Sequence, residues 1–261
     1  MKISIKNLSF KYNKKLKNVV DDLSLTIEEG SIMVLLGLNG CGKTTLIKLL
    51  AGLLPANTGS IEYDSVDIKN ISIKERSKKF AYVPQKTYVA DDFYVKDYLT
   101  YGFVNALKFY ETPKQEQLDK VKSLSEELGI TNLLDKKMGK ISGGERQIVT
   151  IASCLLQDTP IILLDEPTSA LDLKNQNLVL SLLKKIASQG KTIILSSHNP
   201  NHALFLESNV ALMDNGKITQ CGCSIDLIKP DILKKIYGDE VCYSNELSYQ
   251  EISFIRKWLF K

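Results

Sequence analysis

The sequence predicts an α/β fold with a helical insertion. Short apolar runs of strand length, such as Ile32–Leu36 and Ile161–Leu164, recur along the chain between amphipathic, helix-like stretches. The first of these runs passes through a glycine-rich stretch directly into a helix-like segment at 46–54, the strand–turn–helix order of α/β proteins. Strands resume at Thr159, so the helical region between about 86 and 157 is predicted to be an insertion rather than a second domain.

Length and composition limit the possible classes of protein. With 261 residues, 44% of them hydrophobic, the chain can bury a substantial core as one large or two small domains. The net charge of +4 is spread along the sequence without a basic patch, so no nucleic-acid partner is expected. No apolar run is long enough to span a bilayer, and residues 1–6 lack a signal-peptide core. We therefore expect a cytosolic protein, or one attached to a membrane through partners.

The elements expected before residue 86 are mainly strands. Residues 2–10 and 18–28 alternate in polarity like half-buried strands, and a further strand is expected at 60–63. Another strand starts at Phe80 and is stopped by Pro84. In the helical region, the stretches 95–110 and 113–128 are amphipathic and are predicted to be helices, with Gly129 ending the second.

The glycine-rich stretch 37–45 has the G-x-x-x-x-G-K-[ST] pattern of a phosphate-binding loop. Its glycines let backbone N–H groups approach phosphate oxygens, and the helix that begins near Lys43 adds unpaired amides and a favourable dipole. Lys43 would neutralise the β- and γ-phosphates, and the Thr44 hydroxyl would bind Mg²⁺. The residues expected to bind nucleotide are Gly37, Leu38, Asn39, Gly40, Cys41, Gly42, Lys43, Thr44 and Thr45.

Five cysteines, in no disulfide or zinc spacing, are expected to be reduced thiols. Cys41 stands apart, because it lies among backbone donors beside Lys43, surroundings that stabilise a thiolate. We expect Cys41 to react with a maleimide and ATP to protect it.

A second anion contact is predicted where Ser142, Gly143, Gly144 and Glu145 open a helix. Serine followed three residues later by glutamate is a capping box. The two glycines weaken the first helical turn by roughly 1 kcal/mol each relative to alanine, which suggests that backbone approaches an anion there.

Carboxylates and a histidine follow two later strands. Asp165 and Glu166 end the apolar run 161–164, and ligands collect at the carboxyl ends of parallel strands, so Asp165 is expected to hold Mg²⁺ and Glu166 to polarise water. After a helix at Leu173–Ser188, the strand 191–197 leads to His198. His202 could suggest a metal pair, but Pro200 would start a helix and leave His198 outside it, which disfavours such a pair.

In this order, the motifs resemble those of the ATP-binding subunit of an ABC transporter, over essentially the whole chain. The most specific is the signature-like segment 141–147, with Ile141 in place of the usual leucine. The resemblance implies a single ABC-type P-loop ATPase domain over 1–261, with a RecA-like core (about 1–86 and 157–222), an antiparallel β subdomain, an inserted helical subdomain (about 87–156) and a C-terminal extension (about 223–261).

The resemblance also implies roles for individual residues. Tyr12 would stack on adenine, Gln85 would sense Mg²⁺ and couple to the membrane subunit, and Asp172 would lie between two subunits. The Ser142–Glu145 signature of one chain would cover the ATP of the other. The implied catalytic residues are Lys43, Gln85, Glu166 and His198, and the implied Mg²⁺ ligands are Thr44, Gln85 and Asp165.

The implied partners are a second copy of the chain, transmembrane permease subunits and, indirectly, a substrate-binding protein. The chain would then lie peripherally on the cytoplasmic face of the membrane.

Within the family, several segments resemble importers of iron-siderophore, haem and cobalamin complexes: the phosphate loop, the segments 82–85 and 158–160, the segment 171–173 with Gln176, and the tail around 236–238. Asn199 departs from the commoner His-Asp pair and cannot carry the charge that would orient His198. Importers of molybdate, tungstate or another metal ion are the close alternative, and an exporter is more remote.

A soluble ABC protein that acts on ribosomes or DNA is disfavoured. Such proteins usually have tandem ATPase units, coiled-coil insertions or basic arms, and none of these is seen in this sequence. A non-hydrolysing subunit is disfavoured because Lys43, Asp165, Glu166 and His198 are all present.

Overall fold

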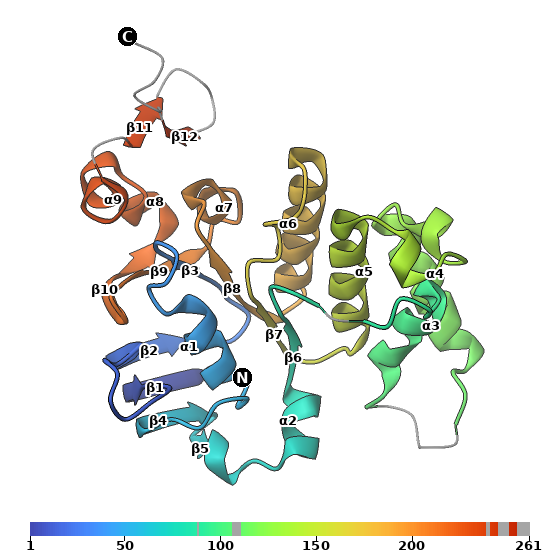
Figure 1. The fold of residues 1–261 in the computed structure, drawn as a ribbon, viewed down its shortest axis with the longest axis horizontal. Coiled ribbons are helices and arrows are strands. Elements are labelled where there is room, and N and C mark those ends of the chain that lie inside the picture. Colours follow the sequence, from blue (N-terminus) through green and yellow to red (C-terminus); the bar gives the residue numbers. More distant parts are fainter. Residues whose placement is uncertain (88, 106–110, 239–240, 245–250, 255–261) are drawn as a thin grey trace.

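The computed structural model describes residues 1–87, 89–105, 111–238, 241–244 and 251–254. Two main sheets, a two-stranded sheet near the C-terminus and several helices make up the described fold (Figure 1). A small antiparallel sheet lies beside a larger mixed sheet, and helix α1 (Lys43–Leu50) packs between them. The helices α3 to α5 lie together, on the far side of the larger sheet from β1 and β2 in this view.

The small sheet has the order β2-β1-β4-β5. Its strands are β1 (Ile3–Phe10), β2 (Val20–Ile27), β4 (Thr58–Tyr63) and β5 (Val66–Asp67). In β1 and β2, buried and exposed residues largely alternate, because one face of the sheet packs on the core and the other meets solvent. The first two predicted strands and the strand at 60–63 are thereby confirmed.

The larger sheet has the order β10-β9-β3-β8-β7-β6. Its members are β3 (Ile32–Leu36), β6 (Phe80–Val83), β7 (Ile161–Leu164), β8 (Thr192–Ser197), β9 (Asn209–Asp214) and β10 (Lys217–Cys223). All pairs are parallel except β9 with β10. The central strands read as continuous apolar runs because helices or the small sheet cover both of their faces.

Two hydrophobic clusters lie on opposite faces of β3. Val34 and Leu36 belong to the cluster that also contains apolar side chains of α5 and α6, whereas Met33 and Leu35 belong to the cluster with α1 and the small sheet. Because successive side chains of a strand point to opposite faces, β3 packs into a hydrophobic cluster on each side. The strand that precedes the phosphate loop is therefore fixed on both faces.

The first helix of the helical region is shorter than predicted. Helix α3 (Val95–Thr100) ends ten residues before the end of the predicted helix 95–110, and a 3₁₀ turn, η2 (Tyr101–Phe103), follows it. Residues 106–110 lie outside the described part of the chain. Cβ of an alanine at Gly102 would come within 2.6 Å of Leu156 Cβ, so the chain turns where it passes close to α5 (Gly143–Leu156). The second helix, α4 (Gln115–Glu127), is confirmed, and Gly129 follows it with φ 66°.

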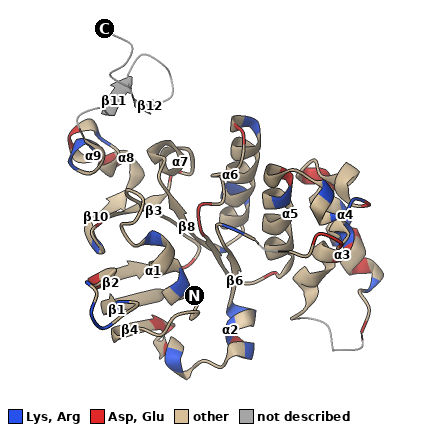
Figure 2. Cartoon of the chain, viewed as in Figure 1, with Lys and Arg blue, Asp and Glu red and all other residues tan. Residues whose placement is uncertain are grey.

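The remaining helices flank the larger sheet. They are α2 (Ile73–Lys79), α6 (Leu173–Ser188), α7 (Pro200–Phe205), α8 (Ser224–Leu227) and α9 (Pro230–Tyr237), with short 3₁₀ turns η1 (Ile68–Asn70), η3 (Thr131–Leu133) and η4 (Met138–Lys140). A hairpin of β11 (Val241–Ser244) and β12 (Glu251–Phe254) follows α9. Among the described residues, no helix combines the length and apolarity needed to cross a membrane. Charges of both signs are interspersed over the elements (Figure 2).

Tyr63 links the small sheet to the helix of the phosphate loop. Its ring is buried, and its hydroxyl donates to the carbonyl of Leu50, at the end of α1, at 2.6 Å. That carbonyl belongs to the last turn of the helix, where it has no partner within the helix.

We expect Tyr63→Phe to lower the free energy of unfolding by about 1–3 kcal/mol, because a buried carbonyl loses its donor. Urea unfolding followed by circular dichroism measures the change. Tyr101→Phe, at an exposed tyrosine, is the control and should leave the free energy within about 0.5 kcal/mol. An equal effect of both variants would show that the Tyr63 hydroxyl contributes nothing specific.

Candidate functional site

The predicted site residues arrive at one edge of the larger sheet from four parallel strands. The phosphate loop follows β3, Gln85 follows β6, Asp165 and Glu166 follow β7, and His198 follows β8. The register pairs Leu36 with Ser197, and Leu164 with both Leu195 and Val83, so the four strands end side by side. The structure thus brings these four motifs together at the carboxyl edge of the sheet.

The phosphate loop wraps around the ammonium group of Lys43. This side chain is buried, and its Nζ donates to the carbonyls of Gly37 at 2.7 Å and Leu38 at 3.0 Å. Gly42 has φ 109°, and a Cβ there would lie 2.5 Å from the carbonyl oxygen of Val19, so the turn requires glycine. A pocket of about 280 Å³ opens over the loop and is lined by Val19, Asn39, Gly40, Gly42, Lys43, Thr44, Thr45, Gln85 and Glu166.

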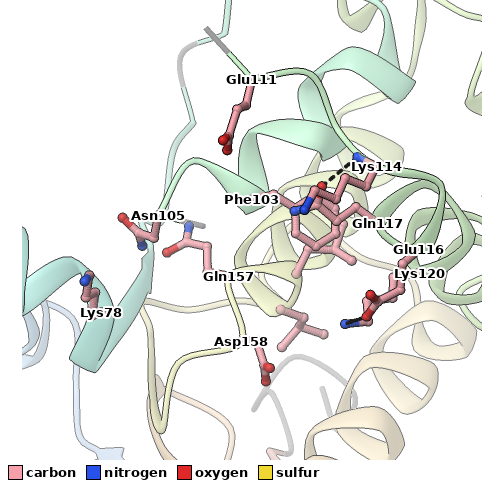
Figure 3. A pocket seen from close by; sticks show the side chains of 13 residues that line it. Lys78, Phe103, Asn105, Glu111, Lys114, Glu116, Gln117, Lys120, Gln157 and Asp158 are labelled. Carbon is pink, nitrogen blue, oxygen red and sulfur yellow. Dashed lines mark hydrogen bonds and ion pairs between the residues drawn. The ribbon is translucent and has the colours of Figure 1, made fainter. Parts of the chain in front are cut away.

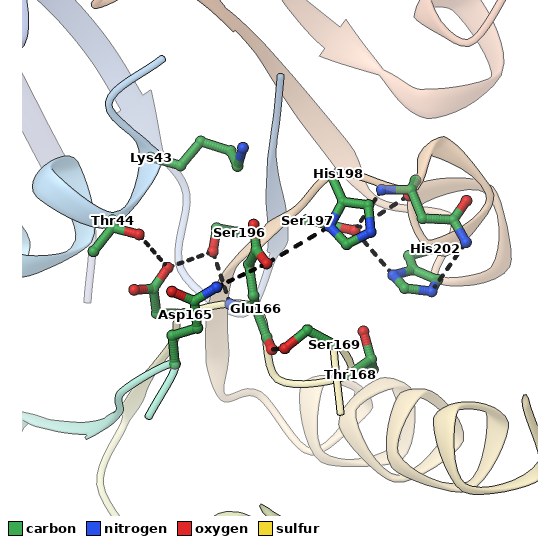
Figure 4. Close-up of polar contacts among 12 residues, drawn as sticks. Lys43, Thr44, Asp165, Glu166, Thr168, Ser169, Ser196, Ser197, His198 and His202 are labelled. Carbon is green, nitrogen blue, oxygen red and sulfur yellow. Dashed lines mark hydrogen bonds and ion pairs between the residues drawn. The ribbon is translucent and has the colours of Figure 1, made fainter. Parts of the chain in front are cut away.

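Asp165 is fixed by two hydroxyl groups. Its Oδ1 accepts from Thr44 Oγ1 at 2.9 Å and from Ser196 Oγ at 2.7 Å, and the residue is only 1% exposed (Figure 4). The hydroxyl and the carboxylate thus lie together at the mouth of the phosphate loop. Oxygen donors of this kind suit Mg²⁺, which prefers carboxylates together with substrate phosphates and water, so the two residues fit the predicted metal.

Ser196 connects the two acids, although no motif in the sequence identifies it. In addition to its bond to Asp165, its Oγ accepts from the backbone N–H of Glu166 at 2.8 Å. Ser196 is buried on β8, the strand next to β7. In the sequence, Ser196 is only a polar residue at the end of an apolar run. Its role depends on the pairing of β8 with β7, which brings it next to Asp165 and Glu166.

Glu166 has a backbone conformation that is uncommon outside glycine, with φ 46°. Its carboxylate accepts from Gln85 Nε2 at 3.1 Å and lies 3.6 Å from Nδ1 of His198, whose side chain is 55% exposed (Figure 4). The structure therefore brings Gln85, Glu166 and His198 together, next to the pocket over the phosphate loop. Such a group can orient a water molecule and accept its proton.

Tyr12 lies beside the start of the phosphate-loop helix. Its ring is 57% exposed and packs edge-on against Phe10, while its hydroxyl is 3.2 Å from Thr45 Oγ1. An exposed ring face next to the loop is compatible with the predicted stacking on adenine.

Ser142 to Glu145 and Asp172 do not line this pocket. Ser142 and Glu145 form the predicted capping box at the start of α5: the Ser142 N–H donates to the Glu145 carboxylate at 2.7 Å, and the Glu145 N–H donates to Ser142 Oγ at 3.2 Å. The hydrogen bond from the Ser142 backbone lowers the pKa of Glu145. Gly143 has open space around its Cβ position, whereas a Cβ added at Gly144 would lie 3.2 Å from the Ala170 carbonyl oxygen. Asp172 caps α6 by accepting from the Asn175 N–H at 2.8 Å.

The expectation of a reactive thiolate at Cys41 is wrong. The Cys41 side chain belongs to the buried cluster beneath the loop, with Sγ turned toward Gly37. Burial raises the pKa of this thiol, and this effect outweighs the attraction of Lys43. Cys41 also does not line the pocket, so any contact it makes with nucleotide would come from its backbone.

His198 and His202 do not share a helix. Pro200 stands in the first turn of α7 and Asn199 caps that helix, so His198 lies outside it, as predicted. His202 is buried within α7, and burial lowers its pKa to about 4. Among the described residues, no group of three or more histidine, cysteine or acidic side chains could hold a metal ion.

A maleimide added to the folded protein should alkylate Cys221 and Cys223 before Cys41 and Cys154, because the first two are exposed and the last two are buried. Peptide mapping by mass spectrometry after timed quenching measures the four rates. Labelling in urea is the control, since unfolding should equalise them. Labelling of Cys41 as fast as that of Cys223 would contradict the buried position of its thiol.

Comparisons with known proteins identify the family. The model of the ABC transporter family, described as "ABC transporter", matches residues 20–169. An ATP-binding protein of Helicobacter pylori named for iron chelatin transport is 39% identical over 220 residues, 84% of this chain and 86% of that protein. The iron(3+)-hydroxamate import ATP-binding protein FhuC of Bacillus subtilis is 31% identical over 90% of this chain and 87% of that protein.

A solved structure supports the same family. A chain from a transporter described as metal-chelate type, in an inward-facing conformation, superposes with a TM-score of 0.81 at 28% identity, covering 98% of both chains. The observed sheets and helices are those of the ABC ATPase cassette. The chain therefore belongs to the ABC transporter family as an ATP-binding subunit, an ATPase that hydrolyses ATP to energise transport.

Proposed function

We propose that the chain powers an importer of iron(III)-siderophore, haem or cobalamin-type complexes, as one of two identical subunits bound to permease subunits at the cytoplasmic face of the membrane. The observation that carries the hydrolytic part is the meeting of Thr44, Asp165 and Glu166 at the mouth of the phosphate loop. The names of the relatives support the class of cargo.

The phosphate loop binds the triphosphate of ATP through its backbone N–H groups. When ATP binds, Lys43 exchanges its hydrogen bonds to the carbonyls of Gly37 and Leu38 for bonds to phosphate oxygens. An ammonium group has only three N–H donors, so the carbonyls and the phosphate oxygens compete for them. Thr44, Asp165 and Gln85 are the residues that would hold Mg²⁺. When bound there, the ion neutralises charge that develops on the phosphates.

Glu166 orients the attacking water and takes up its proton. Gln85 and His198 flank the carboxylate from the strands on either side of β7, so they limit where it can point. His198, with an exposed ring, is positioned to meet the γ-phosphate. The left-handed backbone at Glu166 belongs to this role, because strained residues gather where geometry is imposed by function.

A second copy of the chain completes the site. The Ser142–Glu145 segment lies outside the pocket of its own chain, and the open surroundings of Gly143 leave its helix start accessible. In the proposed dimer, this helix start covers ATP on the other chain with backbone N–H groups and the positive end of the helix dipole. Asp172 and its neighbours pass between the two chains.

A hollow between the core and the helical subdomain is proposed to receive a segment of the permease (Figure 3). Its volume is about 690 Å³, and its lining includes Lys78 of α2, Phe103, Lys114 and Asp158. Asn105 Nδ2 donates to the Ser77 carbonyl at 2.6 Å and so ties the two sides together. Helix α2 runs directly into β6, whose far end leads to Gln85, so displacement at the hollow reaches the site along one strand.

Glu166→Gln should lower the turnover of ATP by about a hundredfold or more, because the amide cannot accept the proton. It should also trap an ATP-bound dimer. Phosphate release and size-exclusion chromatography with ATP measure the two effects, and Glu126→Gln on the exposed surface of α4 is the matched control. Near-normal hydrolysis by Glu166→Gln would count heavily against the proposed base.

The cargo is tested with the chain and its permease subunits in vesicles. ATP-dependent uptake of a ferric siderophore, haem or cobalamin supports the proposal. Uptake of molybdate alone would contradict the class of cargo but not the ATPase role.

A further inference from the structure

His202 is a buried histidine to which the proposed reaction assigns no role. It lies in the first turn of α7 and is 6% exposed. Burial and the nearby His198 lower its pKa to about 4, so its ring is neutral at pH 7. A neutral imidazole has one N–H donor and one acceptor nitrogen, and a buried one needs a partner for each.

On one side, the ring contacts both neighbours of His198. Its Nδ1 is 2.9 Å from Ser197 Oγ, and its Nε2 is 3.3 Å from Asn199 Nδ2 (Figure 4). Ser197 Oγ in turn accepts from the Asn199 N–H at 3.0 Å. The loop that carries His198 is therefore tied to His202 through Ser197, the residue directly before His198.

On the other side, the ring meets helix α6. Its Nε2 lies 3.4 Å from Oε1 of Gln176. The amide nitrogen of Gln176 donates to the carbonyls of Leu171 at 2.9 Å and Thr168 at 3.3 Å. These two bonds turn the amide oxygen toward His202. They also hold the segment 168–172, which begins two residues after Glu166 and ends at Asp172.

The two neutral tautomers of the ring differ in the neighbour to which Nε2 can bond. With the proton on Nε2, the ring donates to Gln176 and Nδ1 accepts from the Ser197 hydroxyl. With the proton on Nδ1, the ring donates to Ser197 and Nε2 accepts from Asn199, whose Oδ1 is engaged with the Asn201 N–H at 3.0 Å. Ser197 serves both forms because a hydroxyl can donate or accept. Only the form with the proton on Nε2 bonds to Gln176, because an unprotonated Nε2 and the amide oxygen of Gln176 are both acceptors.

We infer that His202 is a positioning residue whose ring joins the loop carrying His198 to the segment 168–172 through Gln176. The two loops that flank Glu166 then keep a fixed relative position. The inference deepens the proposed function, since its effect on hydrolysis rests on the roles of Glu166 and His198.

Substitutions at 202 separate this role from a local one. Asparagine places a polar atom close to the position of Nδ1 and can keep the contact with Ser197. Glutamine reaches close to the position of Nε2 and can keep the contact with Gln176. Leucine removes both contacts and retains an apolar side chain of similar bulk.

In the complete transporter, we expect His202→Leu to lower kcat for ATP about tenfold, with KM within about twofold of the wild type, because a lost buried hydrogen bond of ordinary strength corresponds to that factor. His202→Gln should restore most of kcat, and His202→Asn should not. Gln176→Leu should add little to His202→Leu, whereas Asn177→Leu, at an exposed residue of α6, should change kcat little in either background. Unchanged kcat in His202→Leu, or equal rescue by asparagine, would overturn the inference.

A measurement without hydrolysis tests the same link. The chain has two histidines, so isotope-labelled histidine gives ring signals for His198 and His202 alone. Gln176→Leu should shift the His198 signal, and should no longer do so in the His202→Leu background. An unshifted His198 signal in Gln176→Leu would overturn the inference even in an active transporter. Inactive wild type with the expected shifts would instead point to failure of the proposed function.

Discussion

The parallel pairing of β3, β8, β7 and β6 is the constraint on which the site depends. Each strand is too short and too deeply buried to slide, because a shift of one residue would turn its apolar side chains toward the wrong cluster. The ends of the strands are therefore fixed with respect to one another. Every residue proposed for catalysis lies at such an end or within a few residues of it.

The fixed carboxyl ends of these strands also explain why the site can contain strained backbone and buried polar groups. Glu166 and Gly42 have left-handed backbones, and Lys43 is buried with carbonyls as partners. Such features lower the stability of the folded state, and they persist because the surrounding sheet and helices determine their positions. Ser196 illustrates the compensation, since one buried hydroxyl bonds to Asp165 and to the Glu166 backbone.

A second layer of polar groups lies behind the reactive side chains. Ser197, His202 and Gln176 connect elements that are distant in the sequence, and their partners are mostly other polar atoms of the same layer. Buried networks of this kind fix geometry because an unmatched donor or acceptor would carry a substantial penalty. The catalytic strand ends and the segment proposed to reach a second subunit thus belong to one hydrogen-bonded unit.

The sequence by itself determined the strand that leads into the phosphate loop, the capping box at Ser142, the acids after β7 and the exclusion of His198 from α7. Each of these depends on a pattern within about ten residues, such as apolar periodicity, a capping residue or a proline. Tertiary structure decided the burial of Cys41, the end of α3 at Thr100, the bridge made by Ser196 and the contact between His202 and Gln176. These depend on which face of one element packs against another, and that is set by contacts between residues far apart in the chain.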